Sequence, residues 1–336
     1  MNPKISVLTC CFNAERFVSE SIFSILNQTC GDFEYIIVDD GSVDGTAGLL
    51  KEFGERDRRV EVYTKSNTGF TDSLNFGLEK ASGDWIARLD ADDIALPDRL
   101  EKQLHRAEQD DSLVLLGGGC VEIDGEGNTV KSHRYPDSHH ELLSRLEKTK
   151  PFFPHSSAFI RRSRLVEMGG YDRRYVRSQD CDLFLRMAET GEIGCLHVPV
   201  VKLRKHSGMV SNIDSGRLQH LYGAVAVFCH YRRKLGLEDP SAYDDEQWNS
   251  FLRWAEERLE EQGYFDIFRE WKNIRSYVYS DGRRKSVSGY VGLLIDLLSR
   301  KEGRRAIWYR IAENRCSYEL ARQYDGMKST VGGNDA

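Results

Sequence analysis

The chain contains no long hydrophobic run. None of its 336 residues lies in an apolar stretch of about 18 residues, the length that a helix needs to cross a bilayer. Residues 1–8 enter a strand-like segment at once and lack the apolar stretch and small-residue cleavage site of a secretory signal peptide. We therefore expect no membrane-spanning helix and a cytoplasmic location.

Cysteine patterns that build zinc sites or disulfide scaffolds are also missing. The eight cysteines are scattered and include no Cys-x-x-Cys pair. Free thiols in a reducing compartment are the simplest expectation. The formal net charge of −6 argues against a general nucleic-acid-binding protein.

Two nucleotide-binding fingerprints are absent. Gly117-Gly118-Gly119 lacks the Gly-x-Gly-x-x-Gly spacing of dinucleotide-binding folds, and it follows a late strand. The chain also lacks a Gly-x-x-x-x-Gly-Lys-Ser/Thr loop, which would surround phosphates with backbone N–H groups. NAD is therefore not expected, and any bound phosphate must be held by a metal ion and basic side chains.

The sequence does contain an alternation of strands and helices up to about residue 116. Apolar runs predict strands at 4–9, 34–38, 60–63, 84–89 and 113–116, and helical spacing predicts helices at 18–26, 71–80 and from 97. This alternation predicts an α/β fold with a mostly parallel sheet and flanking helices.

The organisation changes after residue 116. We predict a hairpin at 121–133, a helix at 138–149, a strand at 157–161, a helix at 180–187 and an extended segment at 195–204. The pattern is helical beyond about residue 215. The expected organisation is a domain at 1–215 with halves at 1–116 and 117–215, a helical region at 216–331 and a disordered tail at 332–336.

One short segment concentrates three carboxylates. A predicted strand runs directly into Asp90, Asp92 and Asp93. On an extended chain Asp90 and Asp92 point the same way, and two converging carboxylates make an oxygen site for Mg²⁺ or Mn²⁺. The alternative is a polar turn in which Asp93 caps the helix that starts near Pro97. We expect Arg88 to point away from Asp90, in a structural ion pair or in contact with substrate.

A second acidic turn, Asp39-Asp40-Gly41-Ser42, also follows a predicted strand. Ligands of parallel α/β sheets bind beyond the carboxyl ends of the strands, so both acidic turns are expected in one site. Turn and capping chemistry alone is the alternative interpretation of this segment.

These segments resemble the ordered signature of inverting family 2 glycosyltransferases. The resemblance covers about residues 4–210 and rests on five pieces in the expected order, namely residues 5–13, 38–46, Asn67-Thr68-Gly69, residues 89–93 and Gln179-Asp180. It implies a Rossmann-like GT-A fold. The activity it implies is transfer from a nucleotide-diphosphate donor, expected to be a UDP-sugar, to a hydroxyl of a glycan or lipid-linked acceptor in polysaccharide biosynthesis.

The resemblance also implies roles for individual residues. Asp40 would recognise the nucleobase, and a carboxylate can accept a hydrogen bond from the N3–H of uracil. Asp92 would hold the divalent metal, Mn²⁺ or Mg²⁺, with Asp90 as a ribose or second metal contact. Thr9 and Phe12, in the first piece of the signature, are expected at the nucleotide.

Asp180 is the general base that the resemblance implies. An inverting transfer needs a carboxylate to take the proton from the acceptor hydroxyl. The family has a Glu-Asp pair at the start of a helix, whereas this chain has Gln179-Asp180. The alternative is an acidic residue placed by the helix dipole alone. Asp182 should face elsewhere and pair with Arg186.

Residues 202–211 look like the family segment that folds over the donor diphosphate. His206 is a candidate further metal ligand there, and Arg204 or Lys205 is a candidate phosphate contact. A solvated basic loop is the alternative. For His155, which follows a Phe-Phe-Pro turn, we favour packing over contact with the acceptor.

Two other functional classes compete with glycosyl transfer. A metal-dependent nucleotidyltransferase would attack phosphorus and would not need Asp180. A non-catalytic sugar-nucleotide-binding module would lack the metal ligand or the base, and both are present here. These patterns indicate neither the donated sugar nor the acceptor.

The C-terminal region has a charge pattern of its own. Basic residues outnumber acidic ones between Arg283 and Arg310, around the apolar run 290–298. Such a run is too short to span a bilayer but can lie in its interface. We expect either peripheral contact with the inner face of the membrane or packing on the catalytic domain.

Overall fold

The computed structural model describes residues 3–150, 152–206, 216–261, 264–265, 320–322 and 324. The chain divides into two compact units, Met1–Ile213 and Asp214–Ala336. The predicted basic stretch from Arg283 to Arg310, the predicted tail and residues 207–211 lie outside the described residues. The expected membrane contact of the C-terminal region therefore stays a prediction.

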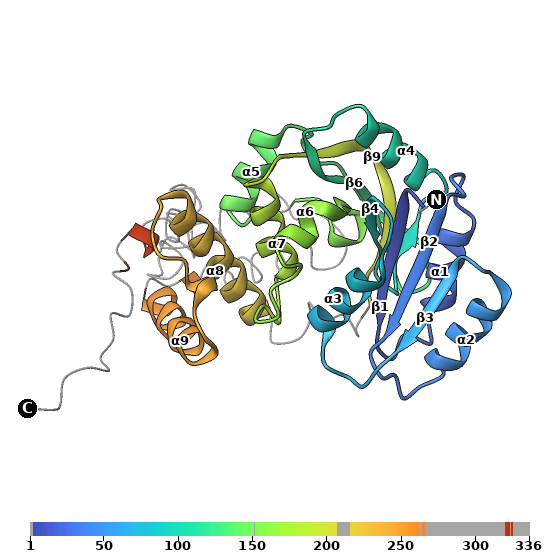
Figure 1. Cartoon of the computed structure of the whole chain (residues 1–336), viewed down its shortest axis with the longest axis horizontal. Coiled ribbons are helices and arrows are strands. Elements are labelled where there is room, and N and C mark those ends of the chain that lie inside the picture. Colours follow the sequence, from blue (N-terminus) through green and yellow to red (C-terminus); the bar gives the residue numbers. More distant parts are fainter. Residues whose placement is uncertain are drawn as a thin grey trace, which may run out of the picture. The chain divides into compact units, whose positions relative to one another are not determined.

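The first unit is an α/β structure with helices on both faces of one sheet (Figure 1). Its strands are β1 (Ile5–Cys11), β2 (Phe33–Asp39), β3 (Val60–Thr64), β4 (Trp85–Arg88), β5 (Ile94–Ala95), β6 (Leu113–Ile123), β7 (Thr129–His133), β8 (Phe159–Arg161) and β9 (Glu192–Arg204). Its helices are α1 (Val18–Leu26), α2 (Thr46–Arg56), α3 (Phe70–Lys80), α4 (Arg99–Glu108), α5 (His139–Glu147), α6 (Arg162–Glu167) and α7 (Gln179–Ala188), with the 3₁₀ turn η1 (His155–Ser157).

The strand order is β3-β2-β1-β4-β8-β6-β9-β5, and β7 pairs with β6 as the predicted hairpin. The predicted α/β class is confirmed. Strands β3, β2, β1 and β4 pair in parallel, each with the next in that order, and β6 pairs in parallel with β9. Strand β8 lies antiparallel between β4 and β6. It runs antiparallel because η1 delivers the chain to the carboxyl end of β4.

The two faces of the sheet are covered by different helices. Alternate residues of β1 and β2 meet the apolar side of α1 and α2 on one face, where Ile22 and Leu50 are fully buried. Helix α3 covers the other face. A Cβ at Gly77 of α3 would lie 2.3 Å from Leu8 Cδ1, so only glycine allows this helix to lie so close to β1.

The second unit contains α8 (Arg217–Lys234), the 3₁₀ turn η3 (Pro240–Ala242) and α9 (Asp245–Glu261). Aromatic rings form its core: Phe228 lies 5.2 Å from Phe251, and Trp254 lies 4.5 Å from Tyr324. The predicted helical region after residue 215 is confirmed for these elements. No helix among the described residues is long and apolar enough to cross a membrane.

Candidate active site

Both predicted acidic turns lie at the same edge of the sheet. Strand β1 pairs in parallel with β2 on one side and with β4 on the other, so the carboxyl ends of all three strands meet there. Cys10 lies between the two turns. The pKa of its thiol is raised to about 12, mainly by burial; the charges of Asp90 and Asp40 also raise this pKa, whereas Arg88 and Lys65 lower it.

Three carboxylates converge where β4 ends. Oxygen atoms of Asp90, Asp92 and Asp93 lie within 4.8 Å of one another. A tight turn brings them together, because the backbone N–H of Asp93 donates to the Asp90 carbonyl at 3.2 Å. Three residues thus present three acidic groups on one side of the chain.

Asp90 is held by two buried groups. Its Oδ1 pairs with Arg88, and its Oδ2 accepts a hydrogen bond from Ser156 Oγ at 2.7 Å. The expectation that Arg88 points away from Asp90 is wrong, because side chains two residues apart on an extended chain share a face. Burial raises the pKa of Asp90, but the Arg88 guanidinium outweighs burial and the pKa lies below its ordinary value.

Asp93 faces inward and does not cap a helix. Ser156 Oγ donates to its Oδ2 at 2.5 Å, and the backbone N–H of Arg204 donates to its Oδ1 at 2.9 Å. Helix α4 begins at Arg99 after Asp98, so the alternative in which Asp93 caps this helix is wrong. Burial and the charges of Asp90 and Asp92 raise the pKa of Asp93 well above its ordinary value.

Asp92 makes fewer hydrogen bonds to other described residues than either neighbour. Its Oδ2 lies 2.9 Å from His206 Nε2, and the His206 ring packs on Phe17 with 5.0 Å between ring centroids. Burial and the Asp90 charge raise the pKa of Asp92, against the effect of His206. The structure therefore brings two of the predicted metal ligands, Asp92 and His206, to one place, and the third, Asp90, lies in the same cluster.

Asp40 anchors the loop that precedes α3. Its Oδ1 pairs with Lys65 and accepts from the Thr68 N–H at 3.0 Å, and its Oδ2 accepts from the Gly69 N–H at 2.9 Å. Gly69 has a φ of +100°, a conformation that favours glycine. A carboxylate has about four acceptor positions, so Asp40 keeps capacity for one more donor.

Thr9 and Phe12, from the first piece of the signature, differ in how exposed their side chains are at this end of the sheet. Phe12, just beyond β1, is 50% exposed, whereas Thr9 is fully buried with its Oγ1 3.0 Å from the Tyr35 hydroxyl. The geometry gives the Thr9 side chain a packing role and leaves Phe12 as the accessible residue. Asn13 does not cap α1; its Oδ1 accepts from the Val43 N–H at 2.9 Å and joins the two loops.

Asp180 lies in the first turn of α7, where it is partly buried. Its Oδ1 accepts from the Cys181 N–H at 2.9 Å. Burial raises the pKa of Asp180, backbone hydrogen bonds oppose this, and the Asp90 charge raises the pKa further while Arg88 lowers it. Asp180 is therefore close enough to Asp90 and Arg88 for their charges to act on its pKa.

Other predicted residues take structural positions. Asp182 pairs with Arg186 at 2.7 Å, as predicted. His155 is buried with Nε2 2.8 Å from the Tyr171 hydroxyl, which agrees with the packing role we favoured. Arg204 is buried against Glu20 and the Phe17 ring, so its guanidinium is not a phosphate contact in this geometry.

Sequence analysis missed two residues of the site. Ser156 bridges Asp90 and Asp93, and Lys65 pairs with Asp40. Neither residue forms a recognisable sequence motif with the aspartates that it contacts. The one local signal is a serine pair that only His155 separates from a Phe-Phe-Pro turn.

Comparisons with known proteins agree with this arrangement. The family model "Glycosyl transferase family 2" matches residues 6–169. The O-antigen biosynthesis glycosyltransferase WbnJ of Escherichia coli is 35% identical over 184 residues, covering 54% of this chain and 71% of that protein. The chain belongs to glycosyltransferase family 2.

Solved structures share the fold of this glycosyltransferase. Residues 1–349 of S. aureus TarS, in complex with UDP-GlcNAc, superpose with a TM-score of 0.58 at 15% identity, covering 95% of this chain and 92% of that one. The mannosyltransferase PcManGT of Pyrobaculum calidifontis, in complex with GDP-Man and Mn²⁺, gives a TM-score of 0.52 at 17% identity, covering 96% and 88%. The GT-A-like fold is thereby confirmed.

The acidic triad of the glycosyltransferase fits a divalent cation. Carboxylate oxygens with one imidazole suit Mn²⁺ or Mg²⁺, and the three carboxylates lie close enough to share one ion. Burial raises the pKa of both Asp92 and Asp93, and the negative charge of the neighbouring carboxylates raises both further. A bound divalent cation would neutralise that charge.

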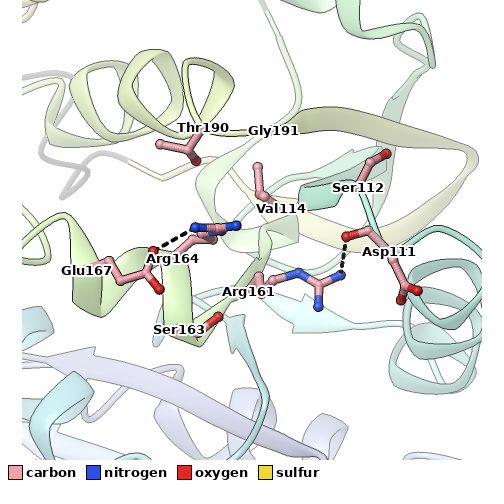
Figure 2. A pocket seen from close by; sticks show the side chains of 9 residues that line it. All are labelled: Asp111, Ser112, Val114, Arg161, Ser163, Arg164, Glu167, Thr190 and Gly191. Atoms are coloured by element: carbon pink, nitrogen blue, oxygen red, sulfur yellow. Dashed lines mark hydrogen bonds and ion pairs between the residues drawn. The ribbon is translucent and has the colours of Figure 1, made fainter.

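A polar pocket of about 380 Å³ lies elsewhere on the glycosyltransferase, where the start of β6 meets the end of β8 and α6 (Figure 2). Arg164 pairs there with Glu167 at 2.8 Å, and Arg161 donates to the Asp111 carbonyl at 3.2 Å. This pocket is at the sheet edge opposite the acidic turns. Its charges compensate one another, and no residue of the predicted site lines it.

Proposed function

We propose that this glycosyltransferase moves a sugar from a nucleotide-diphosphate donor to an acceptor hydroxyl, with inversion and with a divalent metal. One observation carries the proposal: Asp180 is a partly buried carboxylate in the first turn of α7, outside the acidic triad. Inversion needs one base for the acceptor in addition to the groups that hold the donor. Asp180 supplies that second, separate carboxylate.

On the donor side, we propose that Asp40 accepts a hydrogen bond from the nucleobase beside the exposed ring of Phe12. The remaining acceptor position of Asp40 supports this role, and TarS in complex with UDP-GlcNAc supports a UDP-sugar as the first donor to test. Asp92, with His206 beside it, is the proposed metal ligand, and Asp90 the ribose or second metal contact. When bound, the cation supplies charge neutralisation for the departing diphosphate.

On the acceptor side, Asp180 removes the proton of the attacking hydroxyl. We propose a glycan or lipid-linked acceptor of polysaccharide biosynthesis, a proposal supported by the O-antigen role in the name of WbnJ. We also propose a cytoplasmic location. Six described cysteines have free thiols, which is typical of a reducing compartment; they are Cys10, Cys11, Cys30, Cys120, Cys181 and Cys195.

The test is a panel of nucleotide sugars incubated with the full chain and Mn²⁺. Release of nucleoside diphosphate supports glycosyl transfer or donor hydrolysis, whereas pyrophosphate would indicate a nucleotidyltransferase. Binding without turnover would indicate a sugar-nucleotide-binding module. The panel thus separates the proposed function from both competing classes.

Asp92→Asn tests the metal ligand. We expect at least about a 100-fold loss of kcat/KM, because the metal supplies several kcal/mol of transition-state stabilisation. The matched control is Asp98→Asn, which removes a carboxylate paired with Lys102 on the surface of α4 and should leave turnover unchanged. Near-normal turnover of Asp92→Asn, or full activity in EDTA, would contradict the assignment.

A further inference from the structure

Ser156 lies between two carboxylates of the acidic triad. Its side chain is fully buried in η1, and its Oγ lies 2.7 Å from Asp90 Oδ2 and 2.5 Å from Asp93 Oδ2. The same oxygen accepts from the Asp90 N–H at 3.1 Å. The hydroxyl therefore contacts Asp90 twice and Asp93 once.

The Ser156 hydroxyl can donate only one hydrogen bond and accept two, which limits how it can bond to its neighbours. A serine has one proton to donate and two lone pairs. The Asp90 N–H and Arg88 Nη1, at 3.1 and 3.4 Å, face the lone pairs. The single proton then lies between the oxygens of Asp90 and Asp93, two groups that repel each other when both are charged.

The position of Ser156 is itself fixed by backbone structure. The Ser157 N–H donates to the Pro154 carbonyl at 2.9 Å, and the Ala158 N–H donates to the His155 carbonyl at 2.9 Å. Strand β8 then pairs with β4 directly, two residues before Asp90 begins the acidic turn. The hydrogen bonds of η1 and the pairing of β8 with β4 therefore fix the position of the hydroxyl.

We propose that Ser156 is a positioning residue of the metal site: its hydroxyl holds Asp90 and Asp93 together so that the acidic triad is preorganised for a divalent cation. The inference rests on the proposed metal-dependent function and adds a residue that has no metal-ligand role of its own. Outer-shell groups of this kind orient ligands, and their loss typically weakens metal affinity about 10–100-fold.

Ser157 provides a matched control. It is the next residue, it is equally buried, and its hydroxyl donates to the Pro154 carbonyl at 2.8 Å and accepts from the Gly118 N–H at 3.3 Å. Ser157→Ala therefore removes a buried hydroxyl of the same turn without touching a carboxylate. Ser156→Cys is a second variant, because a thiol is close in size to a hydroxyl but is a weak donor.

The experiment titrates the full chain with MnCl₂ and measures free Mn²⁺ by electron paramagnetic resonance, alone and with UDP or GDP. We expect the Kd for Mn²⁺ to rise about 10–100-fold in Ser156→Ala and in Ser156→Cys, and to stay at the wild-type value in Ser157→Ala. Thermal unfolding of each variant is recorded in parallel. Should Ser156→Ala fail to fold, Ser156→Cys decides the question.

Two results would overturn the inference while leaving the proposed function standing. One is wild-type Mn²⁺ affinity in both Ser156 variants, and the other is equal weakening in Ser157→Ala, which would indicate a general loss of packing. If the wild-type chain binds no Mn²⁺ under any of these conditions, the proposed metal dependence fails, and the inference fails with it.

Discussion

Arg88 and Asp90 form an ion pair across one intervening residue, with the Arg88 side chain fully buried and the Asp90 side chain 37% exposed. The guanidinium carbon also lies 5.1 Å from the centroid of the Phe70 ring. A buried cation is therefore neutralised by a carboxylate that reaches the active-site surface. The charge balance of the core and the geometry of the acidic triad depend on the same contact.

Arg88→Met should destabilise the protein by about 1–3 kcal/mol. Loss of one partner of a buried pair costs about 3–5 kcal/mol, and the partial exposure of Asp90 reduces that figure. Urea denaturation measures the change. Arg164→Met is the control, since Arg164 pairs with Glu167 on the surface at 47% and 60% exposure, and it should shift stability by less than about 0.5 kcal/mol. Equal shifts in the two variants would contradict the prediction.

Asp180→Asn should slow transfer strongly while leaving nucleotide binding intact. The substitution removes a proton acceptor that is needed only in the transition state, so we expect kcat to fall by about 10²–10⁴. Single-turnover kinetics with the donor found in the panel, together with calorimetric titration of the nucleoside diphosphate, separates rate from affinity. A loss of donor affinity as large as the loss of rate would place Asp180 in the donor site.

Asp182→Asn is the matched control for this change, because Asp182 is two residues away on α7 and bonded to Arg186. It should lower thermal stability through the broken buried pair and keep the turnover of the folded fraction. We therefore expect Asp180→Asn to lower the rate of transfer, and Asp182→Asn to lower the thermal stability.

The pH dependence follows from the raised pKa of Asp180. As a base, Asp180 must be deprotonated, so kcat/KM should fall on acidification with a midpoint above the ordinary carboxyl value of 3.8. A pH–rate profile measures this limb, which should be missing from the residual activity of Asp180→Asn. A limb at or below 3.8 would contradict the assignment.

The same raised pKa has a consequence for stability. The folded state binds the Asp180 proton more tightly than the unfolded state does, so this stabilising contribution is present below 3.8 and is lost as pH rises through the folded-state pKa. At neutral pH the charged Asp180 therefore opposes folding. Asp180→Asn should be at least as stable as the wild type at pH 7 in thermal unfolding.

Local patterns in the sequence were sufficient to predict the strands and the acidic turn. Apolar runs of four to eight residues mark β2 and β4, and the turn that follows β4 carries its three aspartates within four positions. The pairing of Asp182 with Arg186 was also local, since both lie on one helix face. Such features depend on residues that are neighbours in the chain.

The remainder of the site depends on distant pairing. Ser156 reaches Asp90 across 66 positions, because β8 is inserted beside β4, and Lys65 reaches Asp40 across 25. The alternative in which Asp93 caps a helix failed for a related reason. Its side chain accepts from residues of η1 and the end of β9, and nothing in the local sequence distinguishes those partners from a helix end.

The insertion of β8 between β4 and β6 makes the halves at 1–116 and 117–215 inseparable. A fragment ending near residue 150 would contain every aspartate of the acidic triad. It would lack β8, so the edge of β4 and the side chain of Arg88 would be exposed to solvent. Because Asp93 also accepts from the Arg204 N–H and Asp92 lies beside His206, the site can assemble during synthesis only after residue 206 has emerged. Residues 1–116 therefore cannot bury Arg88 by themselves, and we expect the halves at 1–116 and 117–215 to be inherited as one unit.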